Sequence, residues 1–164
     1  MVYVHRTVER TLKLFLERFS SVGLTGPRQS GKSTMLKRLL AGSYEYVTFD
    51  DHESVRSFHE DPKRFMRVHG DRVIFDEIQR VPELFNYIKI AVDEDRQRRG
   101  KFVLTGSSQF AFMRNITESL AGRIGLITLY PFEYREMPRK LREESIFRGG
   151  FPELVLESYE NFRD

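Results

Sequence analysis

The chain has 164 residues, of which 40% are hydrophobic and 31% are charged, with 11 glycines and 6 prolines. This composition excludes a disordered or fibrous protein and predicts one domain with one hydrophobic core. The lack of cysteine excludes disulfides, zinc sites with thiolate ligands and cysteine nucleophiles. The net charge of +3 arises from interspersed charges, which is typical of a mixed solvated surface rather than a nucleic-acid footprint.

No apolar run is long enough to cross a bilayer, and the polar start of the chain, with His5, Arg6 and Glu9, lacks the apolar core of a signal peptide. These features predict a cytoplasmic protein without a membrane partner. A local basic excess occurs at residues 96–101. An exposed helix end is the favoured interpretation of this excess, and contact with nucleic acid is the weaker alternative.

The first predicted element is an amphipathic helix over residues 8–19, followed by a short buried strand at 22–25. The next stretch, GPRQSGKST from Gly26 to Thr34, fits the phosphate-binding loop pattern G-x-x-x-x-G-K-[ST]. A helix over 32–40 is expected directly after it. This order would place a bound phosphate at a helix N-terminus.

The residue types of this loop suit a nucleoside triphosphate with Mg2+. Gly26 and Gly31 let backbone amides converge on one phosphate, and Lys32 is expected to reach between the β- and γ-phosphates. Ser33 offers the hard oxygen that Mg2+ accepts, and Thr34 a further phosphate contact. A plain glycine-rich turn is the alternative. The residues predicted to bind the nucleotide are Gly26, Pro27, Arg28, Gln29, Ser30, Gly31, Lys32, Ser33 and Thr34.

The rest of the chain alternates short apolar strands with helices. Strands are predicted at 44–49, 73–75, 102–104 and 124–129, and helical segments at 51–69 with a break at Asp61-Pro62, at 84–92 and at 109–120. Strands that are buried on both faces and alternate with helices predict a parallel sheet covered on both sides. The predicted fold class is therefore three-layer α/β.

Three polar clusters fall where predicted strands end: the phosphate loop, Asp76-Glu77, and residues 105–108. In a parallel sheet, the ligand lies beyond the carboxyl ends of the strands. Asp76 suits an outer-shell partner of Mg2+ beside Ser33. Glu77 suits a general base that orients and deprotonates the water attacking the γ-phosphate. A helix cap or turn is the alternative role for such an acidic pair.

Two further side chains are candidates for the γ-phosphate. Ser107 would hold the attacking water or the phosphate, although the hydroxyls of its segment suit a helix cap equally well. Arg123 is the candidate for an arginine, from the same subunit or a neighbour, that neutralises charge on the γ-phosphate. A surface or structural ion pair is its rival role. Arg80 and Arg114 are weaker candidates.

Five segments together resemble the AAA_14 family of bacterial and archaeal AAA-type ATPases. They are TGPRQSGKST from Thr25, FDEIQ from Phe75, FVLTGSSQ from Phe102, ESLAGR from Glu118 and LYPFEYRE from Leu129. The resemblance covers about residues 6–155. It implies a P-loop NTPase fold of the additional-strand, catalytic-glutamate class, with sheet order 5-1-4-3-2.

The resemblance also implies roles for single residues. Lys32 and Ser33 would be the phosphate-loop lysine and the Mg2+ ligand, Asp76 and Glu77 the second motif, and Ser107 the sensor on the fourth strand. Family members usually continue into a further C-terminal region. Residues 1–145 are therefore expected to form the ATPase domain, and residues 146–164 the start of that region, after a junction marked by glycines and a proline.

The predicted function is hydrolysis of ATP to ADP and phosphate with Mg2+, coupled to a C-terminal domain, a partner protein or a second copy of the chain. A small-molecule kinase is disfavoured by the adjacent Asp76 and Glu77. A GTPase is disfavoured because the sequence lacks an Asn-Lys-x-Asp motif. The alternative of a different class is a nucleotide-gated module that binds DNA or protein with little turnover.

Overall fold

The computed structural model describes residues 3–106 and 109–157, and its middle layer is a five-stranded parallel sheet. The strands are β1 (Ser21–Thr25), β2 (Glu45–Thr48), β3 (Val73–Asp76), β4 (Phe102–Thr105) and β5 (Ile124–Thr128). They lie in the order β2-β3-β4-β1-β5, and every neighbouring pair is parallel. This confirms the predicted fold class and the order 5-1-4-3-2, read from the other edge.

The helices before β5 follow the predicted alternation, whereas the two short helices after β5 were not predicted. They are α1 (Glu9–Arg18), α2 (Lys32–Leu39), α3 (His52–Glu60), α4 (Pro62–Val68), α5 (Leu84–Glu94), α6 (Gln109–Ser119), α7 (Arg142–Arg148) and α8 (Pro152–Leu156), with short 3-10 turns η1 (Ile78–Arg80) and η2 (Arg139–Leu141). The break at Asp61-Pro62 is confirmed: the Asp61 carboxylate caps α4 by accepting the Arg64 N–H at 2.9 Å, and proline opens that helix. None of the described helices has the length and apolar character needed to cross a membrane.

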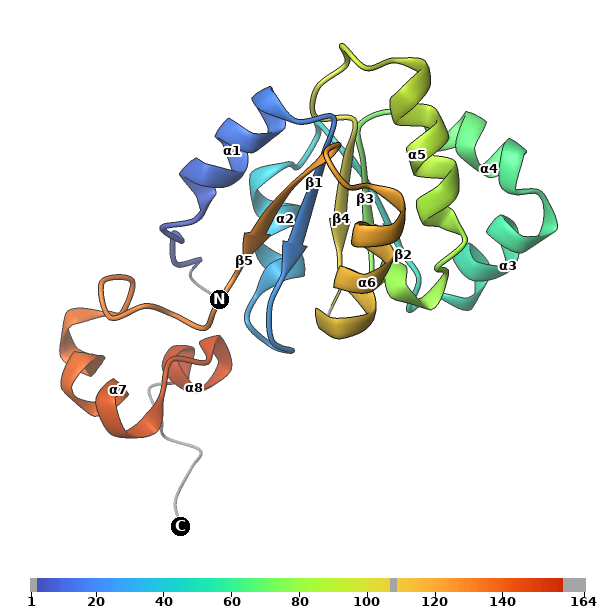
Figure 1. The fold of residues 1–164 in the computed structure, drawn as a ribbon. Helices are drawn as coiled ribbons and strands as arrows, with labels where there is room; N and C mark the ends of the chain where they lie inside the picture. The colour runs from blue at the N-terminus through green and yellow to red at the C-terminus, as the bar shows by residue number, and fades with distance from the viewer. Residues whose placement is uncertain (1–2, 107–108, 158–164) are drawn as a thin grey trace.

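Helices cover both faces of the sheet and give the fold three layers (Figure 1). On one face, α1 and α2 contribute Leu12 and Met35 to a core that includes Ile74 of β3. On the other face, α3 to α6 close a second core, in which Phe85 of α5 lies in the same cluster as Phe75 of β3. Ile74 and Phe75 are neighbours in the chain, so the alternation of a strand sends them to opposite faces.

Strand β1 lies inside the sheet and is buried along its whole length. It pairs with β4 on one side and with β5 on the other, and Ser21 is in register with both Phe102 and Ile124. A Cβ at Gly23 would lie 2.7 Å from Leu126 Cδ2 on β5, so a side chain there would force the exposed Leu126 side chain to shift. This packing fixes the carboxyl end of β1, where the phosphate-loop sequence begins.

The chain after β5 builds a small core of its own. Phe132, Met137, Leu141 and Val155 are buried there, and Val4 from the amino-terminal segment packs against them. Figure 1 shows α7 and α8 beyond the carboxyl end of β5, beside the amino-terminal segment. Helix α7 runs across residues 145–146, where the sequence predicted a domain boundary.

Arg6 ties the amino-terminal segment, the phosphate loop and the C-terminal segment together. Its guanidinium donates to the Ser30 carbonyl at 2.9 Å, to the Tyr130 carbonyl at 2.6 Å and to Glu136 Oε2 at 2.9 Å. It also lies 4.7 Å from the centre of the Phe132 ring. The Arg6 and Glu136 side chains are only 4% and 2% exposed, so this is a buried ion pair with its hydrogen bonds satisfied.

We expect Glu136→Ala to lower the free energy of unfolding by about 3 kcal/mol or more, because it leaves the Arg6 charge buried without its partner. The Glu136 carboxylate also accepts the Thr7 N–H at 2.6 Å, and that bond is lost too. Urea denaturation measures the change. The control is Glu133→Ala, an exposed glutamate of the same segment that should change stability by less than about 0.5 kcal/mol. Equal losses in the two variants would contradict the importance of this ion pair.

Candidate functional site

The phosphate-loop residues form a curved connection from β1 into α2. Gly26 has φ +144° and Gly31 has φ +92°, and residues with a Cβ rarely adopt these backbone conformations. Gly31 is also the N-cap of α2 and brings no side chain to its first turn. The N–H groups of that turn therefore face the loop and suit an anion.

Gly26 is required for a second reason that the sequence did not indicate. A Cβ at this position would overlap the carbonyl oxygen of Leu129, just after β5, and would lie 3.3 Å from Ser30 Oγ. Leu129 is also bound to the end of β1, because its N–H donates to the Thr25 carbonyl at 2.8 Å. The start of the loop is thus held against the neighbouring strand.

Lys32 is folded back onto its own loop. Its ammonium donates to the carbonyls of Gly26 at 2.9 Å and Pro27 at 2.8 Å, and the residue is only 6% exposed. Burial lowers the pKa of Lys32, and the negative charges of Glu77 and Asp76 oppose this shift. The Lys32 ammonium thus lies near the carboxylates of Glu77 and Asp76 at the carboxyl edge of the sheet.

Asp76 ends β3 and faces the first turn of α2. Its Oδ2 accepts the Ser33 hydroxyl at 3.2 Å and also the phenol of Tyr46, which comes from β2. Burial and the hydrogen bond to Asp76 raise the pKa of the Tyr46 phenol, so Tyr46 is a donor here. The other oxygen, Oδ1, is buried and has no hydrogen-bond partner among the described residues.

These groups fit a divalent cation of the Mg2+ type. The Ser33 hydroxyl and the Asp76 carboxylate are hard oxygen donors next to each other, and Asp76 Oδ1 is an orphaned acceptor. Four of the five buried unpaired side-chain atoms in the described residues lie at or beside this edge of the sheet, on Ser30, Asp76, Gln79 and Thr105. Native proteins satisfy nearly all such atoms, so a bound ligand or ordered water is expected to pair with them here.

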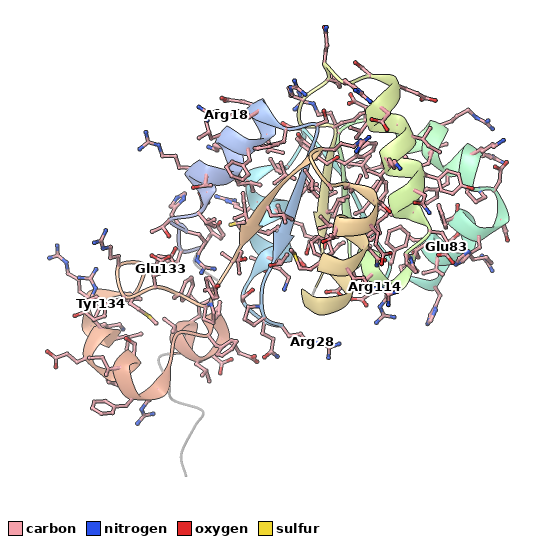
Figure 2. All side chains as sticks on the ribbon, in the orientation of Figure 1. Arg18, Arg28, Glu83, Arg114, Glu133 and Tyr134 are labelled. Atoms are coloured by element: carbon pink, nitrogen blue, oxygen red, sulfur yellow. The ribbon has the colours of Figure 1, made fainter. Side chains whose placement is uncertain are left out.

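One cavity of about 500 Å³ brings most of the predicted residues together. Its lining includes six of the nine predicted loop residues together with Glu77. Glu77 stands at φ +54°, between β3 and η1, and its Oε2 accepts a hydrogen bond from Gln79. Asp50 and Arg80 also line this cavity and form an ion pair of 2.7 Å. Arg28 extends from the loop into solvent (Figure 2).

Arg123 lies at the opposite edge of the sheet. It directly precedes β5, whose first residue is in register with Ser21 at the amino end of β1. Its guanidinium binds both oxygens of Asp93, at 2.8 and 3.0 Å. Arg123 shares a cavity there with Arg18, which Figure 2 shows far from Arg28. The predicted role at the γ-phosphate is therefore corrected for its own chain and stays a prediction only for the site of a neighbouring subunit.

The other three candidates have different outcomes. Arg80 lines the cavity of the phosphate loop in its ion pair with Asp50. Arg114 lies on α6, exposed, in an ion pair of 3.0 Å with Glu118 (Figure 2). Arg114 and Glu118 are one helical turn apart, so this is a surface ion pair within α6. Ser107, the predicted sensor, lies outside the described residues.

A family model of AAA domains, AAA_14, matches residues 18–138. The chain belongs to this family. Two curated relatives, uncharacterized proteins of Mycobacterium bovis and Mycobacterium tuberculosis, are each 33% identical to it over 153 residues. That alignment covers 93% of this chain and 34% of each relative, so the chain spans about a third of their length.

Solved structures support the same fold. The Walker-type ATPase of Pyrococcus abyssi matches with a TM-score of 0.60 at 20% identity, over 87% of this chain and 59% of that protein. The ORC2 protein of Aeropyrum pernix, in its ADP form, gives 0.55 at 16% identity, over 88% and 53%. A STAND protein with a tetratricopeptide repeat sensor from Pyrococcus horikoshii gives 0.63 at 14% identity, over 99% and 31%. The chain is thus an AAA-type P-loop ATPase domain by family and by fold.

This AAA domain has a second cavity, of about 400 Å³, on the other side of the phosphate loop. It shares Gly31 and Thr34 with the loop, and its largely apolar lining includes Val4, Met35 and Leu156. The sequence did not reveal it, because its walls come from the amino-terminal segment, α2 and α8. A flat apolar group attached to a phosphate chain in the loop would fit there.

We expect Gly26→Ala to destabilise the domain by about 3 kcal/mol or more, because the strain of a positive φ adds to the overlap with Leu129. Gly42→Ala is the matched control, since Gly42 has φ +73° and a Cβ there would meet nothing within 4 Å. It should cost only about 1–2 kcal/mol, for the backbone strain alone. Chemical denaturation of both variants measures the difference, and similar losses would show that Leu129 does not constrain the loop.

Proposed function

We propose that this chain binds ATP with Mg2+ at the phosphate loop and hydrolyses it to ADP and phosphate. The observation that carries the proposal is the single cavity that joins Lys32, Ser33 and Glu77, with Asp76 hydrogen-bonded to Ser33 behind it. A cation, hard oxygen donors and a carboxylate that reaches the nucleophile are the groups that phosphoryl transfer to water requires. Membership of the AAA_14 family supports the same activity.

Each residue has a defined task in this proposal. The amides of the loop and of the first turn of α2 receive the β-phosphate, and the Lys32 ammonium exchanges the carbonyls of Gly26 and Pro27 for phosphate oxygens. Ser33 and Asp76 would hold Mg2+, which would neutralise charge on the phosphates. Lys32 and the loop amides also stabilise the charge that spreads over the γ-phosphate oxygens.

Glu77 acts on the nucleophile. Its carboxylate accepts a proton from water while the water oxygen forms a bond to the γ-phosphorus. The bond between that phosphorus and the bridging oxygen of ADP breaks, and its electron pair stays on ADP. The proton leaves Glu77 after the products form, so the enzyme returns to its starting state.

The base of the nucleotide occupies the second cavity in this proposal. Thr34 and Gly31 belong to both cavities, so a nucleotide whose phosphates fill the loop reaches the apolar walls formed by Val4 and Leu156. An apolar cleft binds a purine by its flat faces. The sequence lacks the Asn-Lys-x-Asp motif that reads guanine, which favours adenine.

Coupling of hydrolysis to another part of the protein follows from the same surroundings. We assign residues 1–145 to the ATPase domain and the following residues to the start of the coupled region, with α7 continuous from one into the other. Arg6 connects the loop carbonyl of Ser30 to Glu136, and Pro152 of α8 lies beside Gly31. The curated relatives are about three times as long as the matched segment, which supports a further region that responds to the nucleotide.

A nucleotide-gated module that binds DNA is the second candidate function, and one observation favours it. Four arginines, Arg18, Arg96, Arg99 and Arg123, line a cavity of about 470 Å³ at the amino edge of the sheet, with Asp93 among them. Retention of DNA that requires ATP and falls steeply with salt would support this function. Equal retention with and without ATP would reject nucleotide gating.

We expect Lys32→Ala to weaken ATP binding by about tenfold to 100-fold, because several charge-assisted hydrogen bonds to phosphate are lost. Glu77→Gln should leave ATP affinity within about twofold and lower the rate of phosphate release by about 100-fold or more, because it removes only the proton acceptor. Equilibrium titration with a fluorescent ATP analogue and a phosphate-release assay measure the two effects. Undiminished phosphate release in Glu77→Gln would remove Glu77 from the mechanism.

We expect Leu156→Trp to fill the apolar cavity and weaken ATP binding by about tenfold, in the range of one stacked base. Binding of inorganic tripolyphosphate should stay unchanged, because it needs only the loop. Competition titrations with both compounds test this difference. Leu154→Trp, on the same helix but outside the cavity lining, is the control and should change neither affinity. If Leu156→Trp weakened the binding of ATP and of tripolyphosphate equally, the base would not lie in this cavity.

A further inference from the structure

Gln79 contacts the proposed general base directly, although its role was not predicted from the sequence. Its side-chain Nε2 donates a hydrogen bond to Glu77 Oε2. It also lines the cavity that holds the phosphate loop. The two side chains therefore meet at the wall of the cavity that the phosphate-loop residues also line.

The backbone between the two residues is held in one shape. Glu77 starts the η1 turn in the left-handed region, and the Arg80 N–H donates back to the Glu77 carbonyl at 3.0 Å. On either side of Gln79, Ile78 is fully buried and Arg80 is paired with Asp50. The buried Ile78 thus anchors the turn in the core, and the Gln79 side chain is directed at Glu77.

Gln79 also touches the end of β4. A Cβ at Gly106 would overlap Gln79 Oε1 and would lie 3.1 Å from the Phe112 ring. Gly106 has no left-handed φ, so the constraint here is space: a Cβ would force the Gln79 amide to move. The amide of Gln79 therefore fills the gap between β3 and β4 that a side chain at position 106 would otherwise take.

The carbonyl end of the amide is unsatisfied. Gln79 Oε1 is buried and has no hydrogen-bond partner in the described part of the chain. Thr105 Oγ1, one residue before Gly106, is buried and unpaired as well. Unpaired buried atoms of this kind cost stability, so each requires a partner such as a bound ligand or an ordered water.

We infer that Gln79 is a positioning residue that holds the Glu77 carboxylate in its working orientation, and that Gly106 is glycine in order to admit it. The hydrogen bond to Oε2 fixes one oxygen of Glu77 and thereby aims the carboxylate at the attacking water. A hydrogen bond to a charged acceptor is strong enough to select one rotamer. This inference rests on the proposed role of Glu77 in hydrolysis.

The first test is Gln79→Ala. We expect kcat for ATP hydrolysis to fall by about 10- to 100-fold, the size of effect that a misplaced catalytic group produces, while KM and the Kd for ATP stay within about twofold. Gln97→Ala, an exposed glutamine in the loop after α5, is the matched control and should match the wild type. A rise in KM with kcat unchanged would overturn the inference, because it would make Gln79 a substrate contact.

The second test uses Gly106→Ala in two backgrounds. Alone, this substitution should lower kcat as Gln79→Ala does, because the new methyl group displaces the Gln79 amide. In the Gln79→Ala background, the Gln79 atoms that it overlaps are gone and only the 3.1 Å approach to the Phe112 ring remains, so it should lower kcat by less than about a further twofold. Equal multiplicative losses in both backgrounds would show that Gly106 acts independently of Gln79 and would overturn the inference.

A third measurement separates this inference from the proposed function. The contact between Glu77 and Gln79 is tested without turnover by a double-mutant cycle of Glu77→Ala and Gln79→Ala on the unfolding midpoint. If the unfolding midpoints of the variants are non-additive but the wild type binds ATP without hydrolysing it, the contact stands and the hydrolysis proposal is wrong. Additive shifts would overturn the pairing of Glu77 with Gln79, whatever the activity.

Discussion

The burial of β1 in the middle of the sheet is the constraint on which the phosphate loop depends. All five residues of the strand are buried, and it hydrogen-bonds to β4 and β5 at once. Its carboxyl end cannot shift without breaking one of these ladders. Gly26 follows that end and passes so close to the Leu129 carbonyl that no Cβ fits between them. The sheet, more than the loop's own contacts, therefore sets where a phosphate is received.

The same packing buries charged groups that a protein interior normally excludes. Arg6, Lys32 and Asp76 are 6%, 6% and 5% exposed. Each buried charge costs stability unless it is paired. Arg6 is paired with Glu136, and Lys32 rests on the carbonyls of Gly26 and Pro27 in its own loop, whereas Asp76 keeps one oxygen without a partner among the described residues. The Arg6–Glu136 pair, whose charges are matched, thus belongs to the scaffold. The unpaired oxygen of Asp76 lies where a ligand would supply the missing contact.

Local patterns were enough to predict the strands, most helix boundaries and the phosphate loop, because each is written in neighbouring residues. The sheet order came from the family resemblance. Contacts over long distances in the chain were not predictable in this way. The Arg6–Glu136 pair joins residues 130 positions apart, and Tyr46 meets Asp76 only because β2 and β3 are paired in register. Neither contact leaves a periodic signal in the sequence.

Arg123 shows what strand direction adds to such reasoning. It was chosen for its residue type and its place in ESLAGR, yet it precedes β5, and residues before the strands of a parallel sheet lie at the edge opposite the ligand. Asp76 and Glu77 follow a strand and lie at the ligand edge. Gln79 is only two residues further along, but its relation to Glu77 depends on the left-handed turn at position 77, which the sequence FDEIQ does not display.

The back of the phosphate loop is in contact with the C-terminal segment, so the two are not mechanically independent. The position of a Cβ on Gly31 would be 3.7 Å from both Arg6 Nη1 and Pro152 Cγ of α8. Arg6 also holds the carbonyls of Ser30 and Tyr130 with one guanidinium. A close-packed interior transmits a displacement rather than absorbing it. If Ser30 moves when Lys32 turns toward phosphate, Arg6 must move or lose a buried hydrogen bond, and either response reaches residues 129–157. A guanidinium shared between loop and C-terminal segment thus gives the proposed coupling a specific physical route.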